Sequence, residues 1–144
     1  MVENSSVNKT PWWFWAVSVF AVLWTLMGLN DYYNSITINV KYLSQIDGMV
    51  EFMQAMPVWA KGVWGLAIGS AFLASVLMLL RKKIAVPIYI IALLAMFVSF
   101  GYQFSTPNKP DVPNWVHAFT ALIWAIAFFL TWFSRKMTAR GILR

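Results

Sequence analysis

Four long apolar runs divide this chain, and each is long enough to cross a lipid bilayer. The runs without a charged side chain are residues 11–30, 62–80, 84–108 and 112–134. A helix needs about 20 mainly apolar residues to cross the hydrocarbon layer, and soluble cores do not hold apolar runs of this length. The pattern therefore predicts transmembrane helices over about 11–31, 58–80, 84–104 and 113–134.

These four spans leave little of the chain for anything else. Most of the 144 residues belong to them, so we expect a single integral membrane domain over 1–144. The composition agrees, because 11% charged residues is far below the roughly 25% of an average soluble domain. The predicted fold class is an all-α membrane protein built as a four-transmembrane-helix bundle.

The loop between the first two spans has a helical rhythm of its own over residues 39–56. Its apolar positions recur three or four residues apart, with polar residues largely between them. These positions are Val40, Leu43, Ile46, Val50 and Met53. The spacing predicts an amphipathic helix, which either lies flat in the membrane interface or covers the mouth of the bundle like a lid.

The positive charges predict the orientation of the bundle. Eight of the eleven lysine and arginine residues fall on the side that holds both termini and the link between spans two and three. These are Lys9, Arg81, Lys82, Lys83, Arg135, Lys136, Arg140 and Arg144. Cytoplasmic segments carry an excess of lysine and arginine, so both termini are expected in the cytoplasm of a multi-pass plasma-membrane protein. The basic tail over 135–144 either sets this topology or also contacts anionic lipid.

The second span carries small residues at helix-packing spacing. Gly65 and Gly69 form a G-x-x-x-G pair, and Ala67 and Ala71 form a neighbouring ridge. Small side chains let helix backbones approach each other closely within a bilayer. The partner helix belongs either to the same chain or to another subunit, so we expect a homo-oligomer or a larger membrane complex.

Polar residues near the outer ends of the spans are the candidates for a binding site. Trp24, Gly28 and Asp31 are spaced four and three residues apart, so they share one face of the first span. A carboxylate accepts hydrogen bonds, and an indole offers a flat apolar surface to a sugar ring or an organic cation. With Lys61 and His117, expected at the same end, they form the predicted ligand-binding site. The alternative is that Asp31 is simply solvated or pairs with Lys61.

His117 is the single histidine of a chain that has no cysteine. One histidine cannot supply bis-histidine haem ligation, nor a zinc site without other ligands nearby. It either titrates near neutral pH and exchanges a proton with Asp31 or Asp111, or it is a satisfied interfacial side chain. We expect no metal site and no cofactor.

The sequence also lacks the motifs of common enzymes. It contains no nucleophile elbow, no phosphate-binding glycine loop and no H-E-x-x-H helix. An enzyme is therefore not expected. The net charge of +6 does not indicate nucleic-acid binding either, because the cations flank membrane spans.

Two segments carry a resemblance to known proteins. The segments are Trp24-Thr-Leu-Met-Gly-Leu-Asn-Asp-Tyr and Leu79-Leu-Arg-Lys-Lys-Ile-Ala-Val-Pro. They resemble a group of small bacterial four-span inner-membrane proteins of unknown function, some of which carry the name sugar transporter, with a DoxX-like layout. The resemblance implies a bacterial inner-membrane setting and supplies no catalytic residue.

Two functions of different classes follow from these observations. The first is a small transporter or ligand-binding membrane protein with an outward-facing polar site. The second is an accessory or assembly subunit of a larger membrane complex. The carboxylate at the end of the first span favours the first function, and the small size and sparse polar inventory favour the second.

Overall fold

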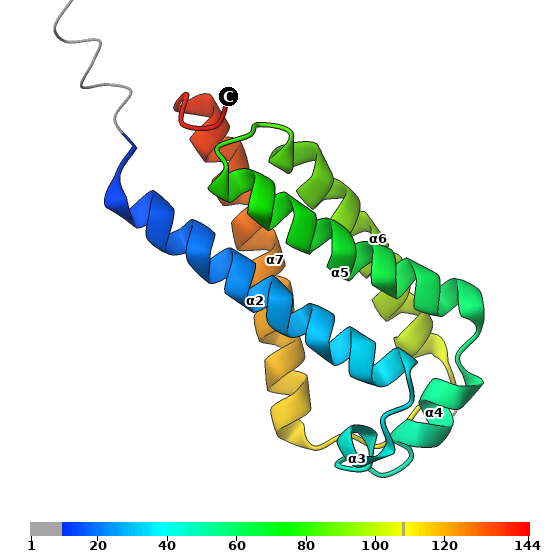
Figure 1. Ribbon diagram of the computed structural model, residues 1–144. Helices are drawn as coiled ribbons and strands as arrows, with labels where there is room; N and C mark the ends of the chain where they lie inside the picture. The colour runs from blue at the N-terminus through cyan, green and yellow to red at the C-terminus, as the bar shows by residue number, and fades with distance from the viewer. Residues whose placement is uncertain (1–9, 108) are drawn as a thin grey trace, which may run out of the picture.

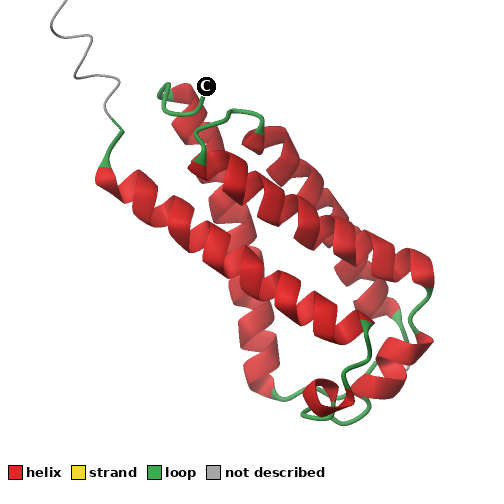
Figure 2. Cartoon of the chain, viewed as in Figure 1, coloured by secondary structure: helices red, strands yellow, loops and turns green. Residues whose placement is uncertain are grey.

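The computed structural model describes residues 10–107 and 109–144, and this part of the chain is helical without any strand, as Figure 1 and Figure 2 show. Lys9, one of the cations used to predict orientation, lies outside the described residues. The helices are α2 (Trp12–Ile36), α3 (Val40–Leu43), α4 (Met49–Ala55), α5 (Val58–Leu79), α6 (Ala85–Ser105) and α7 (Asn114–Ala139). Helices α2, α5, α6 and α7 are long and apolar enough to cross a membrane. The predicted all-α fold with four spanning helices is confirmed.

Helix α5 is the centre of the bundle. It packs along α6 on one side and along α2 on the other, and α7 crosses behind α2 (Figure 1). All four long helices meet in a buried cluster near the C-terminal end of the chain. Phe14 of α2, Met78 of α5, Tyr89 of α6 and Phe133 of α7 are each buried in it. The best-packed part of the bundle is therefore the end that also holds the α5–α6 turn.

Prolines mark the starts of three spanning helices. Pro11, Pro57 and Pro113 each stand immediately before a helix with extended backbone angles. The backbone N–H groups at the start of a helix have no acceptor within the helix. Proline lacks this N–H, so it stands there without the loss of a hydrogen bond. The first helix also continues to Ile36, past its predicted end near residue 31. Asp31 consequently lies inside α2, with a turn of helix after it.

The loop between the first two spans folds into two short helices instead of one. Helices α3 and α4 are separated by a turn that ends at Gly48, whose φ of +80° is one that other residues rarely adopt. Leu43, Phe52, Met53, Met56 and Ala60 form a second buried cluster there. Trp64 of α5 and Tyr102 of α6 pack against this cluster. Residues 39–56, here named the cap, thus pack against the ends of α5 and α6.

The last residues of the chain fasten α7 to the α5–α6 turn. The Arg144 amide donates to the Arg81 carbonyl at 2.9 Å, and the Lys83 amide donates to a main-chain oxygen of Arg144 at 3.1 Å. Ile142 and Leu143 are buried in the cluster shared by the long helices. This tail is therefore part of the packed core.

Candidate functional site

Asp31 of α2 is bound by a tyrosine of the cap. The Tyr42 hydroxyl donates a hydrogen bond to Asp31 Oδ1 at 2.5 Å. Asn39 positions this tyrosine, because its Oδ1 caps α3 and accepts a bond from the Tyr42 amide at 3.2 Å. Burial, the hydrogen bond and the negative charge of Asp31 together raise the pKa of Tyr42 from 10.0 to about 12. The hydroxyl stays protonated at neutral pH, so the pair joins the cap to α2.

Lys61 contacts the first helix through its backbone. The Tyr32 hydroxyl donates to the Lys61 carbonyl at 2.9 Å. The Tyr32 ring meets Trp64 edge to face, with the ring centroids 5.0 Å apart. Asp31 is satisfied by Tyr42, and the neighbouring tyrosine, not Asp31, joins α2 to the Lys61 region of α5.

Trp24 and Gly28 face different neighbours. The Trp24 ring lies 6.1 Å from that of Phe20 and 5.8 Å from that of Phe119 on α7. Gly28 faces α5 instead, since a Cβ there would lie 3.9 Å from Ile68 Cγ2. Residues 24, 28 and 31 lie on one face of α2. A different element packs against this face at each of them: α7 at residue 24, α5 at residue 28 and α3 at residue 31.

His117 lies in the first turn of α7, with its side chain exposed. The five residues of the predicted ligand site therefore do not all contact the same element of the described chain. Trp24 packs on α7, Gly28 on α5 and Asp31 on the cap. Whether they bind a ligand together stays a prediction.

The predicted packing stripe of α5 divides into an internal part and an open part. A Cβ on Gly65 would lie 2.5 Å from the Tyr32 hydroxyl, so this glycine makes room for α2. Ala67 is buried and Ala71 half-buried. Gly69 has nothing within 4 Å of where a Cβ would lie. Gly65 packs within the chain, and Gly69 leaves a notch on the surface of α5.

Two polar contacts were not anticipated from the sequence. One is the bond from Tyr42 to Asp31, for which the Asn39 cap of α3 was the available signal. The other joins α5 to α6, where the Ser75 and Tyr89 hydroxyls share a buried hydrogen bond of 2.8 Å. Its signal was a tyrosine within an apolar span, because a buried tyrosine hydroxyl usually finds a partner. Both contacts fasten helices together.

Within residues 10–107 and 109–144, no group of three or more histidine, aspartate or glutamate side chains is placed to hold a metal ion. Comparison of the chain with protein-family models, with curated proteins and with solved structures finds no match. The likeness to small bacterial four-span proteins accordingly stays a prediction. What the four apolar helices establish is that the chain is a multi-pass integral membrane protein.

Proposed function

We propose that this protein is an accessory or assembly subunit of a larger membrane complex. The observation that carries the proposal is the first half of α7. No residue between 114 and 129 is buried in the described structure. The buried residues of α7 all follow in its second half, and they are Leu130, Phe133, Ser134 and Met137.

Aromatic rings on the first half of α7 contact the neighbouring helices. Phe119 meets Trp24 of α2, and Trp124 meets Phe97 of α6 with ring centroids 4.7 Å apart. Other large side chains on this half point outward, with Trp115 64% and Leu122 47% exposed. Helices associate in a bilayer through close packing and polar contacts. The proposed occupant is an apolar transmembrane helix of another protein, packed along this half of α7.

Two matched substitutions test this proposal. Ala125 on α7 and Ala16 on α2 are both exposed alanines within spans. Ala125→Trp adds bulk where the partner helix would approach, whereas Ala16→Trp adds the same bulk to an exposed surface of α2. Each full-length variant is expressed in its native membrane, purified in mild detergent and analysed for copurifying proteins and for total mass.

We expect the wild-type protein and the Ala16→Trp control to retain one membrane protein in a fixed stoichiometry. The Ala125→Trp variant should retain it at least about tenfold less, which corresponds to ~1.4 kcal/mol. A wild-type protein that purifies alone, as a monomer or as a closed homo-oligomer, would overturn the proposal. Equal release by both substitutions would also contradict it.

The second candidate function is ligand binding or transport at the outer end of the bundle. Asp31 favours this function. Of the acidic residues that the structure describes, it is the one that lies on one of the four long helices. This half-buried side chain lies where α2 meets the cap, bonded to Tyr42. A ligand would replace Tyr42 as the partner of the carboxylate. Lys61 in the first turn of α5 and His117 in the first turn of α7 lie at the same end of the bundle, whereas Trp24 lies in the middle of α2.

Thermal stability of the purified protein tests this second function, with choline and glucose as probes. A probe that binds raises the melting temperature, and Asp31→Asn should abolish that rise. Tyr42→Phe frees the carboxylate and should keep or increase it. The function is rejected if neither probe changes the melting temperature, or if Asp31→Asn leaves the change intact.

A further inference from the structure

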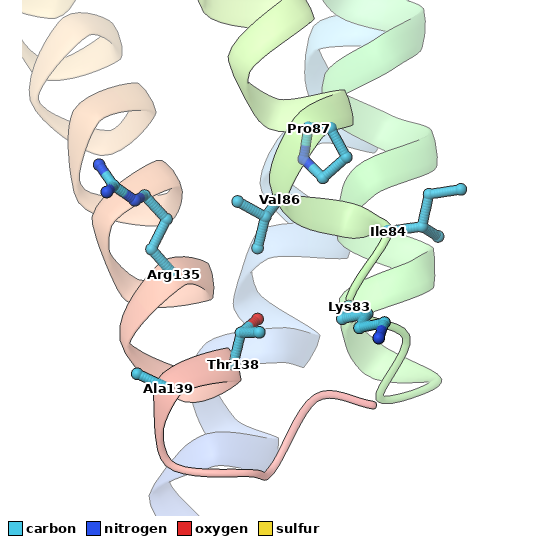
Figure 3. Close-up of a pocket in the computed structure, with 7 residues that line it drawn as sticks. All are labelled: Lys83, Ile84, Val86, Pro87, Arg135, Thr138 and Ala139. Carbon is cyan, nitrogen blue, oxygen red and sulfur yellow. The ribbon is translucent and has the colours of Figure 1, made fainter.

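A groove lies between α6 and α7 at the end of the bundle that holds the α5–α6 turn. Its volume is about 660 Å³, and it is lined by Lys83, Ile84, Val86, Pro87, Arg135, Thr138 and Ala139. Lys83 comes from the turn and Arg135 from α7, on either side of Val86 and Thr138 (Figure 3). A second groove, lined by Trp132, Arg135 and Lys136, shares Arg135 with the first.

This end of the bundle is strongly basic. It carries seven cationic side chains, which are Arg81, Lys82, Lys83, Arg135, Lys136, Arg140 and Arg144. The acidic residues of the described chain belong to elements at the opposite end of the bundle (Figure 1). They are Asp31 near the end of α2, Asp47 between α3 and α4, Glu51 in α4 and Asp111 just before α7. Glu3 is outside the described residues. The groove cations therefore have no carboxylate side chain beside them in the described part of the chain.

The walls of the groove are apolar. Ile84 is 55% exposed, and the exposed Pro87 continues the surface along α6 toward the middle of the span. The first amides of α6 are already occupied, because Ala85 donates to the Lys82 carbonyl and Val86 to the Lys83 carbonyl. An anion in this groove would thus be held by the lysine and arginine side chains. A hydrocarbon chain attached to it would lie along the apolar wall.

The neighbouring tryptophan places the groove at the depth of lipid headgroups. The Lys136 ammonium lies 4.9 Å from the centroid of the Trp132 ring. Tryptophan is enriched where the hydrocarbon layer meets the headgroups, and basic pockets between helices on the cytoplasmic side suit anionic headgroups. Cations, apolar wall and depth all agree with one kind of occupant.

We propose that the α6–α7 groove is a binding site for an anionic phospholipid. Lys83 and Arg135 line opposite sides of the groove, and in the complex their side chains turn toward the phosphate and donate hydrogen bonds to its oxygens. The acyl chain follows Val86 and Pro87 along α6. This site is independent of the partner helix proposed for the first half of α7.

Native mass spectrometry of the full-length protein in detergent tests the site, with phosphatidylglycerol and phosphatidylcholine as probes. The wild-type protein should bind phosphatidylglycerol more tightly. The variant K83Q/R135Q should lose about thirtyfold of that affinity, equivalent to ~2 kcal/mol for two basic residues. Its matched control is K82Q/R140Q, which removes the same charge from the same end but leaves the groove residues in place.

Two further arms separate a lipid site from simpler causes. Val86→Phe fills the groove without changing its charge and should also weaken phosphatidylglycerol binding. Inorganic phosphate at millimolar concentration should not displace the lipid. Equal binding of the two lipids, equal losses in the two double variants, or displacement by inorganic phosphate would each overturn the proposal. Lipid-free melting temperatures of the variants identify any that fails to fold.

Discussion

Replacing Tyr42 by phenylalanine should loosen the cap while leaving the four spans folded. The substitution removes one hydroxyl, which donates to Asp31 at 2.5 Å. A hydrogen bond to a charged group contributes about 1.5–3 kcal/mol. Because Asp31 is half-buried and regains water when the bond is lost, the lower end applies. We expect a loss of about 1.5 kcal/mol, or roughly a tenfold larger opening constant for the cap.

Hydrogen exchange of the cap amides measures this change directly. In Tyr42→Phe, amides of residues 40–56 should exchange about tenfold faster, while amides within α5 and α6 should not change. Tyr33→Phe is the matched control, because the Tyr33 side chain is 64% exposed on the same helix as Asp31. A double-mutant cycle with Asp31→Asn should give a coupling of at least about 1 kcal/mol. Additive effects of Tyr42→Phe and Asp31→Asn would refute the reasoning.

The same pair makes cap stability depend on alkaline pH. The pKa of Tyr42 is about 12 in the folded protein against 10.0 ordinarily. A group whose pKa is raised by folding stabilises the folded state below the unfolded pKa, and this contribution is lost as pH rises through the folded pKa. The contribution, about 1 kcal/mol after allowing for solvent screening, should therefore disappear between pH 10 and 12. The exchange rates of the cap amides are compared between the wild-type protein and Tyr42→Phe, so that the contribution of Tyr42 is separated from that of the other tyrosines. If the difference between the two proteins is the same at pH 12 as at neutral pH, the prediction is contradicted.

Three other substitutions, with a fourth as a control, have expected effects on the melting temperature in detergent. Gly65→Ala should destabilise by about 1–3 kcal/mol, because its Cβ would displace the Tyr32 hydroxyl, whereas Gly69→Ala enters open space and should be neutral. Ser75→Ala should cost about 0.6–1.7 kcal/mol by removing the buried hydroxyl bond between α5 and α6. Gly141→Ala should cost about 1–2 kcal/mol, since φ is +78° there. If the melting temperature is unchanged in Gly65→Ala, Ser75→Ala or Gly141→Ala, the explanation given for that substitution is contradicted.

The spanning helices could be predicted because their signal is local. An uncharged apolar run of sufficient length has few alternatives to a transmembrane helix. The break in the cap was less accessible, although Gly48 was visible in the sequence. Apolar positions at helical spacing persist on both sides of Gly48. Only the left-handed backbone at this glycine shows that the periodicity belongs to two helices.

The candidate site was harder to predict because its contacts join separate elements. Trp24, Gly28 and Asp31 lie on one continuous helix, α2, and their spacing puts them on one face of it. Which neighbour meets that face at each height depends on the crossing of α7 and on the turn that leads into α3. A sequence pattern along one helix carries neither quantity. For the same reason the pairing of Asp31 with Tyr42, eleven residues later, was not foreseen.

The two halves of α7 are held so differently that the two proposed interactions can be tested separately. The second half is part of the core, since Phe133 and Met137 are buried and the tail that follows α7 is bonded to the α5–α6 turn. The exposure of the first half is therefore local, and does not reflect a loosely attached helix. Ala125→Trp should consequently leave phosphatidylglycerol binding unchanged, and K83Q/R135Q should leave partner binding unchanged. If either variant abolishes both interactions, α7 acts as one rigid unit and the separation is wrong.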